Sequence, residues 1–173
     1  MQTKIHFRLT LWAIFLILLL GMNVSHANEP SVTIKETDRC PVCGMFVYKY
    51  PKWIALIVFQ DGAHYFYDGV KDMFKHIFDT AKYTPGRSAE TIKEIYVTDY
   101  YDVELIDAKS AFYVIGSDVL GPMGHELLPF KDQESAQEFL EDHAGKSILR
   151  FQEVTPVIIE SLGAAQSMRH PEK

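Results

Sequence analysis

Cysteine is scarce in this sequence. The 173 residues contain only Cys40 and Cys43, and no second Cys-x-x-Cys pair or closely spaced His pair accompanies them. Two cysteines are too few for a small scaffold held together by several disulfides. A closed zinc site usually takes four Cys or His ligands, which come as two such pairs. The two thiols therefore have a local role.

Basic residues are also in the minority. The chain has 17 Lys and Arg against 23 Asp and Glu, which gives a net charge of −6. A surface of this sign repels phosphate backbones, so the composition argues against a nucleic acid partner. The length is sufficient for one domain with a substantial core or for two small lobes.

The N-terminal stretch has the parts of a secretory signal. Lys4 and Arg8 precede an apolar run at residues 9–22, and small residues at 25–27 suit a signal peptidase. The run is shorter than the roughly 20 residues of a spanning helix. We expect export to the periplasm with cleavage of residues 1–27 after Ala27; an uncleaved leader is the alternative and would be the only membrane attachment.

Cleavage would also change the charge and the anchoring of the protein. The leader contains two basic residues and no acidic one, so the remaining 146 residues would have a net charge of −8. No cysteine directly follows the apolar run, so the sequence offers no acceptor for a bacterial lipid anchor. A polar lead-in at residues 28–39 lacks a clear period and precedes the first ordered element.

Hydrophobic periodicity after this lead-in predicts two units with the same order of elements. The first, residues 40–101, reads as strand, strand, helix and strand. Its expected elements are strands at 53–59 and 63–67, a helix at 68–79 with Asp68 as the N-cap, and a strand from 92 to 97. The first unit is therefore ββαβ.

The second unit, residues 102–163, repeats this order. Its expected elements are a short strand at 103–107, a strong strand at 111–116, a loop at 117–126, a strand at 126–130, a helix at 131–145, a strand at 147–154 and a last short helix at 156–162. Residues 164–173 would form a flexible tail. Helices on one face of mostly antiparallel strands make an α+β fold of two tandem ββαβ units.

The motif CPVCGM at residues 40–45 is compatible with three chemistries. A thioredoxin-like redox couple would place it after a strand and at a helix N-terminus, but here it precedes the first strong strand. A zinc site would need single histidines such as His64 or His125 to complete it. A Cu(I) site would need further soft ligands, because Cu(I) prefers thiolate and thioether.

Soft ligands are available in two places. Met45 lies two residues after Cys43, and the glycine-flanked loop GPMGHE offers Met123, His125 and Glu126. Met123 and His125 are two residues apart, so an extended chain directs both to one side. A single methionine is more often core filler, and the same loop is compatible with an ordinary polar turn.

Other candidate ligands have simpler interpretations. Met73 lies on the apolar face of the first expected helix and is assigned to the core. His76 and His143 have charged neighbours on helices, so we expect them to be solvated. His64 alternates with aromatic residues on the second strand and could line the core edge or face a ligand.

Several motifs together resemble the NosL family, whose members are exported copper-binding accessory proteins for nitrous oxide reductase assembly. The motifs are CPVCGM at 40–45, DGVKDMF at 68–74, VTDYYD at 97–102, IDAKSAFYVIGSDVLGPMGHELLPF at 106–130 and SILRF at 147–151. The resemblance implies a fold of two ββαβ units similar to that of organomercurial lyase. Family members are typically lipoproteins, and this sequence departs from them in lacking the lipid-acceptor cysteine.

The resemblance also implies a function without catalysis. A NosL-like protein would bind Cu(I) and deliver it to the copper–sulfide centre of nitrous oxide reductase, with the reductase and its membrane transporter complex as partners. Carried over by motif, the ligands would be Cys40, Cys43 and Met123, with Met45 and His125 as further candidates. The alternatives are a periplasmic thiol–disulfide oxidoreductase, a carbon–mercury lyase, or another metal-binding module that uses the Cys-x-x-Cys motif.

Overall fold

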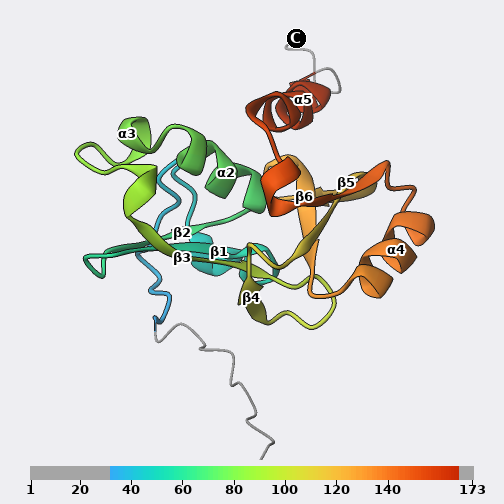
Figure 1. Cartoon of the computed structure of the whole chain (residues 1–173), viewed down its shortest axis with the longest axis horizontal. Coiled ribbons are helices and arrows are strands. Elements are labelled where there is room, and N and C mark those ends of the chain that lie inside the picture. The colour runs from blue at the N-terminus through green and yellow to red at the C-terminus, as the bar shows by residue number, and fades with distance from the viewer. Residues whose placement is uncertain (1–31, 168–173) are drawn as a thin grey trace, which may run out of the picture. The chain divides into compact units, whose positions relative to one another are not determined.

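The computed structural model describes residues 32–167 (Figure 1). The expected signal peptide, residues 28–31 of the lead-in and residues 168–173 of the expected tail lie outside this range. The described part contains a four-stranded sheet of order β2-β1-β3-β4 and a three-stranded sheet of order β6-β5-β7. Every strand pairing is antiparallel, and helices accompany both sheets. This arrangement confirms the predicted α+β class.

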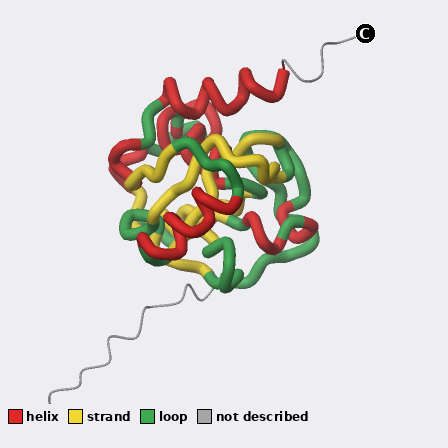
Figure 2. The backbone as a smooth tube through the Cα atoms, turned by 90° about the vertical axis from the view of Figure 1, so that its right-hand side faces the viewer, coloured by secondary structure: helices red, strands yellow, loops and turns green. Residues whose placement is uncertain are grey.

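The elements follow one another without long gaps. In chain order they are η1 (Val47–Lys49), η2 (Pro51–Trp53), β1 (Ala55–Phe59), β2 (His64–Tyr67), α2 (Val70–Phe78), α3 (Thr80–Tyr83), η3 (Ala89–Thr91), β3 (Ile92–Thr98), β4 (Leu105–Asp107), β5 (Phe112–Gly121), β6 (Gly124–Phe130), α4 (Gln133–Asp142), β7 (Ser147–Arg150), η4 (Phe151–Glu153) and α5 (Pro156–Ser167). Figure 2 shows the helices on the outside of the strands.

Strand β1 forms the centre of the larger core. It is flanked by β2 and β3, and Ala55, Leu56 and Ile57 are all fully buried. Consecutive strand residues point to opposite faces, so this burial means that both faces of β1 are covered. Cys40 and Val47 belong to the same core cluster. The segment that contains the cysteines is therefore held against the first sheet.

Strand β4 pairs with β3, whereas the sequence analysis placed residues 103–107 in the second unit. The reason is the tight turn between the two strands. The buried Asp99 accepts hydrogen bonds from the main-chain N–H groups of Tyr101 and Asp102, and its own N–H donates to the carbonyl of Glu104. This turn returns the chain beside β3. The division into tandem units remains a prediction, although each sheet places its first strand between its second strand and a strand that follows a helix.

The expected loop at residues 117–126 is mostly a hairpin. Strand β5 continues to Gly121 and β6 begins at Gly124, with the tip residues paired to each other. The ladder is irregular between Ile115 and Leu120, where Gly116 has a φ of 76°. Glycine adopts this left-handed conformation without strain, so the glycines bend the hairpin without ending it. The prediction of a loop was wrong for this reason.

The expectation of a solvated His76 was also wrong. His76 is fully buried on α2, three residues after Met73, which lies in the core as predicted. Its Nε2 is 2.9 Å from Thr84 Oγ1, and the Thr84 hydroxyl donates its own proton to the carbonyl of Thr80. Nε2 therefore carries the imidazole proton, and Nδ1 accepts from the Tyr67 hydroxyl at 2.6 Å. The network holds His76 neutral.

This network predicts a loss of stability in acid. Burial lowers the pKa of His76 to about 4, from a usual value of 6.5. The unfolded chain takes up this proton as the pH falls below about 6.5, while the folded protein does not until about pH 4. The stability contributed by His76 is therefore present above pH 6.5 and lost on acidification. We expect the free energy of unfolding, measured by urea denaturation, to fall by about 2 kcal/mol between pH 7 and pH 5 because of this group.

A His76→Gln variant is the control for this measurement. Burial raises the pKa of Glu126 to about 7, so Glu126 titrates in the opposite sense over the same range. The comparison between the two proteins isolates His76, since Glu126 is present in both. The variant should be less stable at pH 7 and should lose less stability on acidification. Identical pH dependence in the two proteins would contradict the assignment.

Candidate metal centre

The two cysteines lie on a short closed loop. The N–H of Cys40 donates to the carbonyl of Met45 at 2.9 Å, and the N–H of Gly44 donates back to the carbonyl of Cys40 at 2.9 Å. Gly44 has a φ of 77°, which closes the turn in a conformation that residues with a Cβ rarely adopt. Both cysteines are free thiols; Cys40 is buried and Cys43 is partly exposed.

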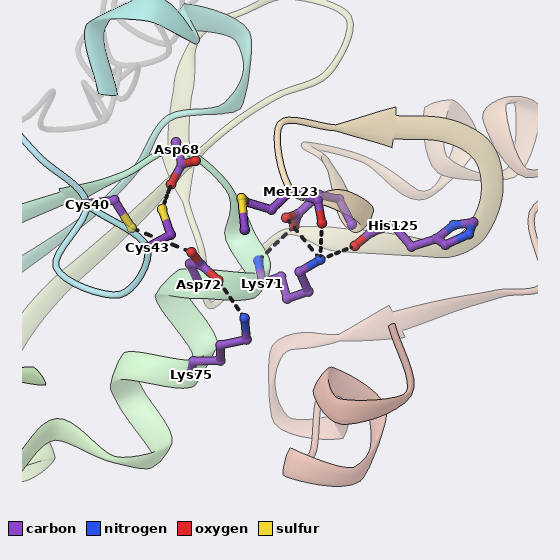
Figure 3. A network of polar contacts seen from close by, with 9 residues as sticks. Cys40, Cys43, Asp68, Lys71, Asp72, Lys75, Met123 and His125 are labelled. Carbon is purple, nitrogen blue, oxygen red and sulfur yellow. Dashed lines mark hydrogen bonds and ion pairs between the residues drawn. The ribbon is translucent and has the colours of Figure 1, made fainter. Parts of the chain in front are cut away.

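The start of α2 places two carboxylates beside these thiols. Asp68 Oδ1 accepts a hydrogen bond from Cys43 Sγ at 3.0 Å, and Asp72 Oδ2 lies 3.6 Å from Cys40 Sγ (Figure 3). Asp68 precedes the N-cap of α2 and Asp72 lies in its first turn, so both carboxylates come from the start of the helix. One ligand atom from each of the four residues lies within 4.8 Å of the others. This is the single cluster of its kind among residues 32–167.

The electrostatics of the cluster favour a protonated Cys43 thiol. The hydrogen bond with Cys40 raises the pKa of Cys43 far above its usual range, and burial and the hydrogen bond to Asp68 act in the same direction. Both aspartates are about 1% exposed. Asp72 also accepts from Lys75 Nζ at 2.8 Å, whereas Asp68 Oδ2 is buried without a hydrogen bond partner. The group therefore combines thiol donors with uncompensated negative charge.

This donor set fits a bound cation. A buried carboxylate oxygen with no partner costs free energy, which a cation at the centre of the cluster would offset. Two thiols supply the soft ligands that Cu(I) and Zn²⁺ prefer, and the carboxylates supply harder oxygen ligands. The geometry alone is compatible with either ion.

The predicted N-cap, Asp68, does not cap α2. The helix begins at Val70 with Gly69 in the N-cap position, and Gly69 provides no side-chain cap. The carboxylate of Asp68 is directed instead to the thiol of Cys43. Glu126 takes over the capping role from β6, because its Oε2 accepts from the N–H of Lys71 at 2.8 Å.

Of the three further candidate ligands, Met123 lies best for a place at the thiols. Met123 is in the tip of the β5–β6 hairpin, and its side chain extends toward the side where Asp68 and Cys43 lie (Figure 3). The imidazole of His125 extends in the opposite direction, and its carbonyl accepts from Lys71. Met45 contributes main-chain groups to the cysteine loop. The ligand roles of these three residues remain predictions.

Sequence reasoning missed the two aspartates. Both lie within the motif DGVKDMF, and their spacing of four residues at a helix start was the signal that could have identified them. Two further histidines, His64 and His143, are not part of the thiol and carboxylate cluster. His64 is exposed, and the partly exposed His143, expected to be solvated, pairs with Asp118 at 3.1 Å and stacks on Phe139.

No helix within residues 32–167 has both the length and the hydrophobicity required to cross a bilayer.

Comparisons with known proteins agree with these features. The chain is 29% identical over 155 residues to the copper-binding lipoprotein NosL of Stutzerimonas stutzeri, covering 85% of this chain and 75% of that protein. Its fold is similar to the crystal structure of the copper chaperone NosL from Shewanella denitrificans, with a TM-score of 0.64 and 25% identity over 75% of this chain and 98% of that one. The NosL family profile matches residues 31–159, most of the sequence. The chain therefore belongs to the NosL family.

Proposed function

We propose that this protein is an exported Cu(I) chaperone that delivers copper for assembly of the copper–sulfide centre of nitrous oxide reductase. The observation that carries the proposal is the pair of free thiols, Cys40 and Cys43, held beside two buried carboxylates. Two relatives support the choice of metal, since one is named a copper-binding lipoprotein and the other a copper chaperone. The protein acts by binding and transfer and needs no catalytic step.

Cu(I) would replace the thiol protons at the two sulfur atoms. Cys40 and Cys43 then bind the ion as thiolates, and the Met123 thioether completes a three-coordinate site, with Met45 and His125 as further candidates. Metal binding to thiols releases protons and depends on pH for that reason. The positive charge of the ion would also offset Asp68, whose Oδ2 has no partner in the metal-free protein.

Transfer of copper requires a site that an incoming ligand can enter. Cys40 is almost fully buried, whereas Cys43 and Met123 are partly exposed and Gly44 is exposed. A partner ligand would therefore approach from the side of Cys43. A three-coordinate ion accepts such a ligand, while a closed four-coordinate cage would retain the metal.

The partners follow from charge and from export. We propose that the recipient is nitrous oxide reductase with its membrane transporter complex, in the periplasm. An acidic chaperone, with a net charge of −6 for the whole sequence, would favour a basic patch on the recipient. The leader offers no lipid-acceptor cysteine after its apolar run, so attachment to a membrane would depend on an uncleaved leader.

The first test measures Cu(I) affinity by competition with a chromophoric chelator. Replacement of both thiols, Cys40→Ser with Cys43→Ser, should lower the affinity at least about 100-fold, because two of the three soft ligands are lost. Met123→Leu should lower it about tenfold. Met73→Leu is the matched control: this methionine is in the core, and the change conserves volume.

Unchanged affinity in the double cysteine variant would refute the copper site. The identity of the recipient needs a separate measurement in a denitrifying host. Deletion of the gene for this chain should yield a reductase without its copper–sulfide centre, detected by metal content and loss of nitrous oxide reduction. A fully loaded reductase in that strain would leave the copper site intact and exclude this recipient.

The raised pKa of Cys43 argues against the rival dithiol oxidoreductase. The thiolate is the nucleophile in thiol–disulfide exchange, and redox enzymes lower the pKa of the attacking cysteine. Here the neighbouring thiol, burial and Asp68 all raise it. Cys43, the more exposed of the two thiols, therefore lacks the lowered pKa of an attacking cysteine.

Alkylation of the reduced, metal-free protein tests this point. At pH 7.5, iodoacetamide should modify Cys43 at least about 10-fold more slowly in the folded protein than in the same protein in urea, because the thiolate is depleted. Burial of the sulfur also slows alkylation, but only a raised pKa moves the pH at which the rate levels off. The pH profile therefore separates the two causes. The folded rate should still be rising at pH 10. A plateau near neutral pH would favour an oxidoreductase.

A further inference from the structure

Lys71 joins the start of α2 to the tip of the β5–β6 hairpin. Its side chain is 2% exposed, and its Nζ donates to the carbonyls of Met123 and His125, each at 2.7 Å (Figure 3). Its main-chain N–H donates to Glu126 Oε2 at 2.8 Å. Three of the four residues from Met123 to Glu126, all but Gly124, thus contact a single residue of the helix.

The hairpin ladder alone holds the tip weakly. Beyond the irregular stretch that ends at Leu120, only the pairs Leu120 with His125 and Gly121 with Gly124 continue the ladder. Two ladder pairs do not fix the direction of a bent hairpin tip, so that direction depends on other contacts. The bonds from Lys71 supply such contacts at the residue that contains the predicted thioether ligand.

The close approach of helix and hairpin depends on two glycines. A Cβ at Gly69 would lie 2.6 Å from Glu126 Oε1, and a Cβ at Gly121 would lie 2.5 Å from Glu126 Cγ. Both glycines come from motifs that the sequence analysis selected, DGVKDMF and GPMGHE. Their missing side chains leave the space in which Glu126 and Lys71 meet.

A lysine suits this position because of its donor geometry. An ammonium group has three donors that can separate in space, so two can serve carbonyls while the charge faces Glu126 Oε1 at 3.8 Å. The planar fork of an arginine directs its donors to one plane. Burial of the Lys71 ammonium is unfavourable without these partners, so the helix start and the hairpin tip must stay in contact for Lys71 to remain buried.

We propose that Lys71 is a positioning residue that sets the reach of the Met123 thioether toward the thiols of Cys40 and Cys43. The proposal rests on the Cu(I) function given above. Lys71 lies between Asp68 and Asp72, which contact the two thiols, so one turn of helix fixes the cysteine side and the methionine side of the site. Lys71 acts on copper through Met123 and does not itself bind the ion.

The test is a double-mutant cycle on Cu(I) affinity. Lys71→Leu is combined with Glu126→Gln, so that no unpaired buried charge remains and no new sulfur ligand is introduced. This pair variant should lower the affinity about tenfold, as Met123→Leu does, because the thioether is no longer held in reach. In the Met123→Leu background the same pair variant should change the affinity less than about twofold, since the thioether that Lys71 positions is absent.

Lys75→Leu is the matched control, from the same helix. Lys75 contacts Asp72 on the cysteine side and is not bonded to the hairpin tip in the contacts of the described residues. Any effect of its replacement should therefore be equal in the Met123 and Met123→Leu backgrounds. X-ray absorption of the copper-loaded proteins gives a second readout: the number of sulfur ligands should fall from three to two in the pair variant.

Each outcome decides the proposal. Equal losses from the pair variant in both backgrounds would overturn it and make Lys71 a merely structural residue. An unchanged affinity in Met123→Leu would also overturn the role of Lys71. If the double cysteine variant still loses Cu(I) binding in that case, the proposed chaperone function is retained. No Cu(I) binding by the unmodified protein would overturn both. If circular dichroism shows that the pair variant does not fold, Lys71→Arg makes the same cycle with the charge retained.

Discussion

The arrangement depends on the burial of charge at the start of α2. Asp68, Lys71 and Asp72 are each no more than 2% exposed, and each charge is met from a different direction. Lys71 faces the second sheet, while the two aspartates face the cysteine loop. Burial of charges is unfavourable unless every one has a partner, and Asp68 Oδ2 has none in the metal-free protein. The fold thus accepts a local cost at the proposed metal site.

Because these charges face two sheets, α2 links parts of the chain that are distant in sequence. The cysteine loop precedes the first sheet, and the hairpin tip with Met123 belongs to the second. Glu126 caps the helix from β6, which ties the orientation of α2 to the hairpin. A shift of the helix start would therefore move the carboxylates and the thioether together. The site is a property of the packing between the sheets and not of either motif alone.

The sequence predicts the parts of this arrangement that depend on local periodicity. The apolar spacing of α2 and the β-branched run of β1 can both be read from the sequence. Contacts between residues that are distant in the sequence could not be predicted from it. Asp68 was assigned to a cap because its tertiary partner, Cys43, lies 25 residues away. His76 was predicted to be solvated because its neighbours in sequence are charged, and the sequence does not show its hydrogen-bond partners, Tyr67 and Thr84.

The hydrogen bonds of the thiols bear on how the proposed copper site would stay reduced if the protein is exported as proposed. An oxidising compartment favours disulfides, and exchange proceeds through the thiolate. Each thiol here faces a carboxylate, and the raised pKa of Cys43 keeps that sulfur protonated. Copper(I) differs from an oxidant because its affinity for sulfur can displace the proton directly. Asp68, which disfavours the Cys43 thiolate in the metal-free protein, would then face a cation. The carboxylates would therefore slow oxidation of the thiol pair to a disulfide but would still permit copper binding.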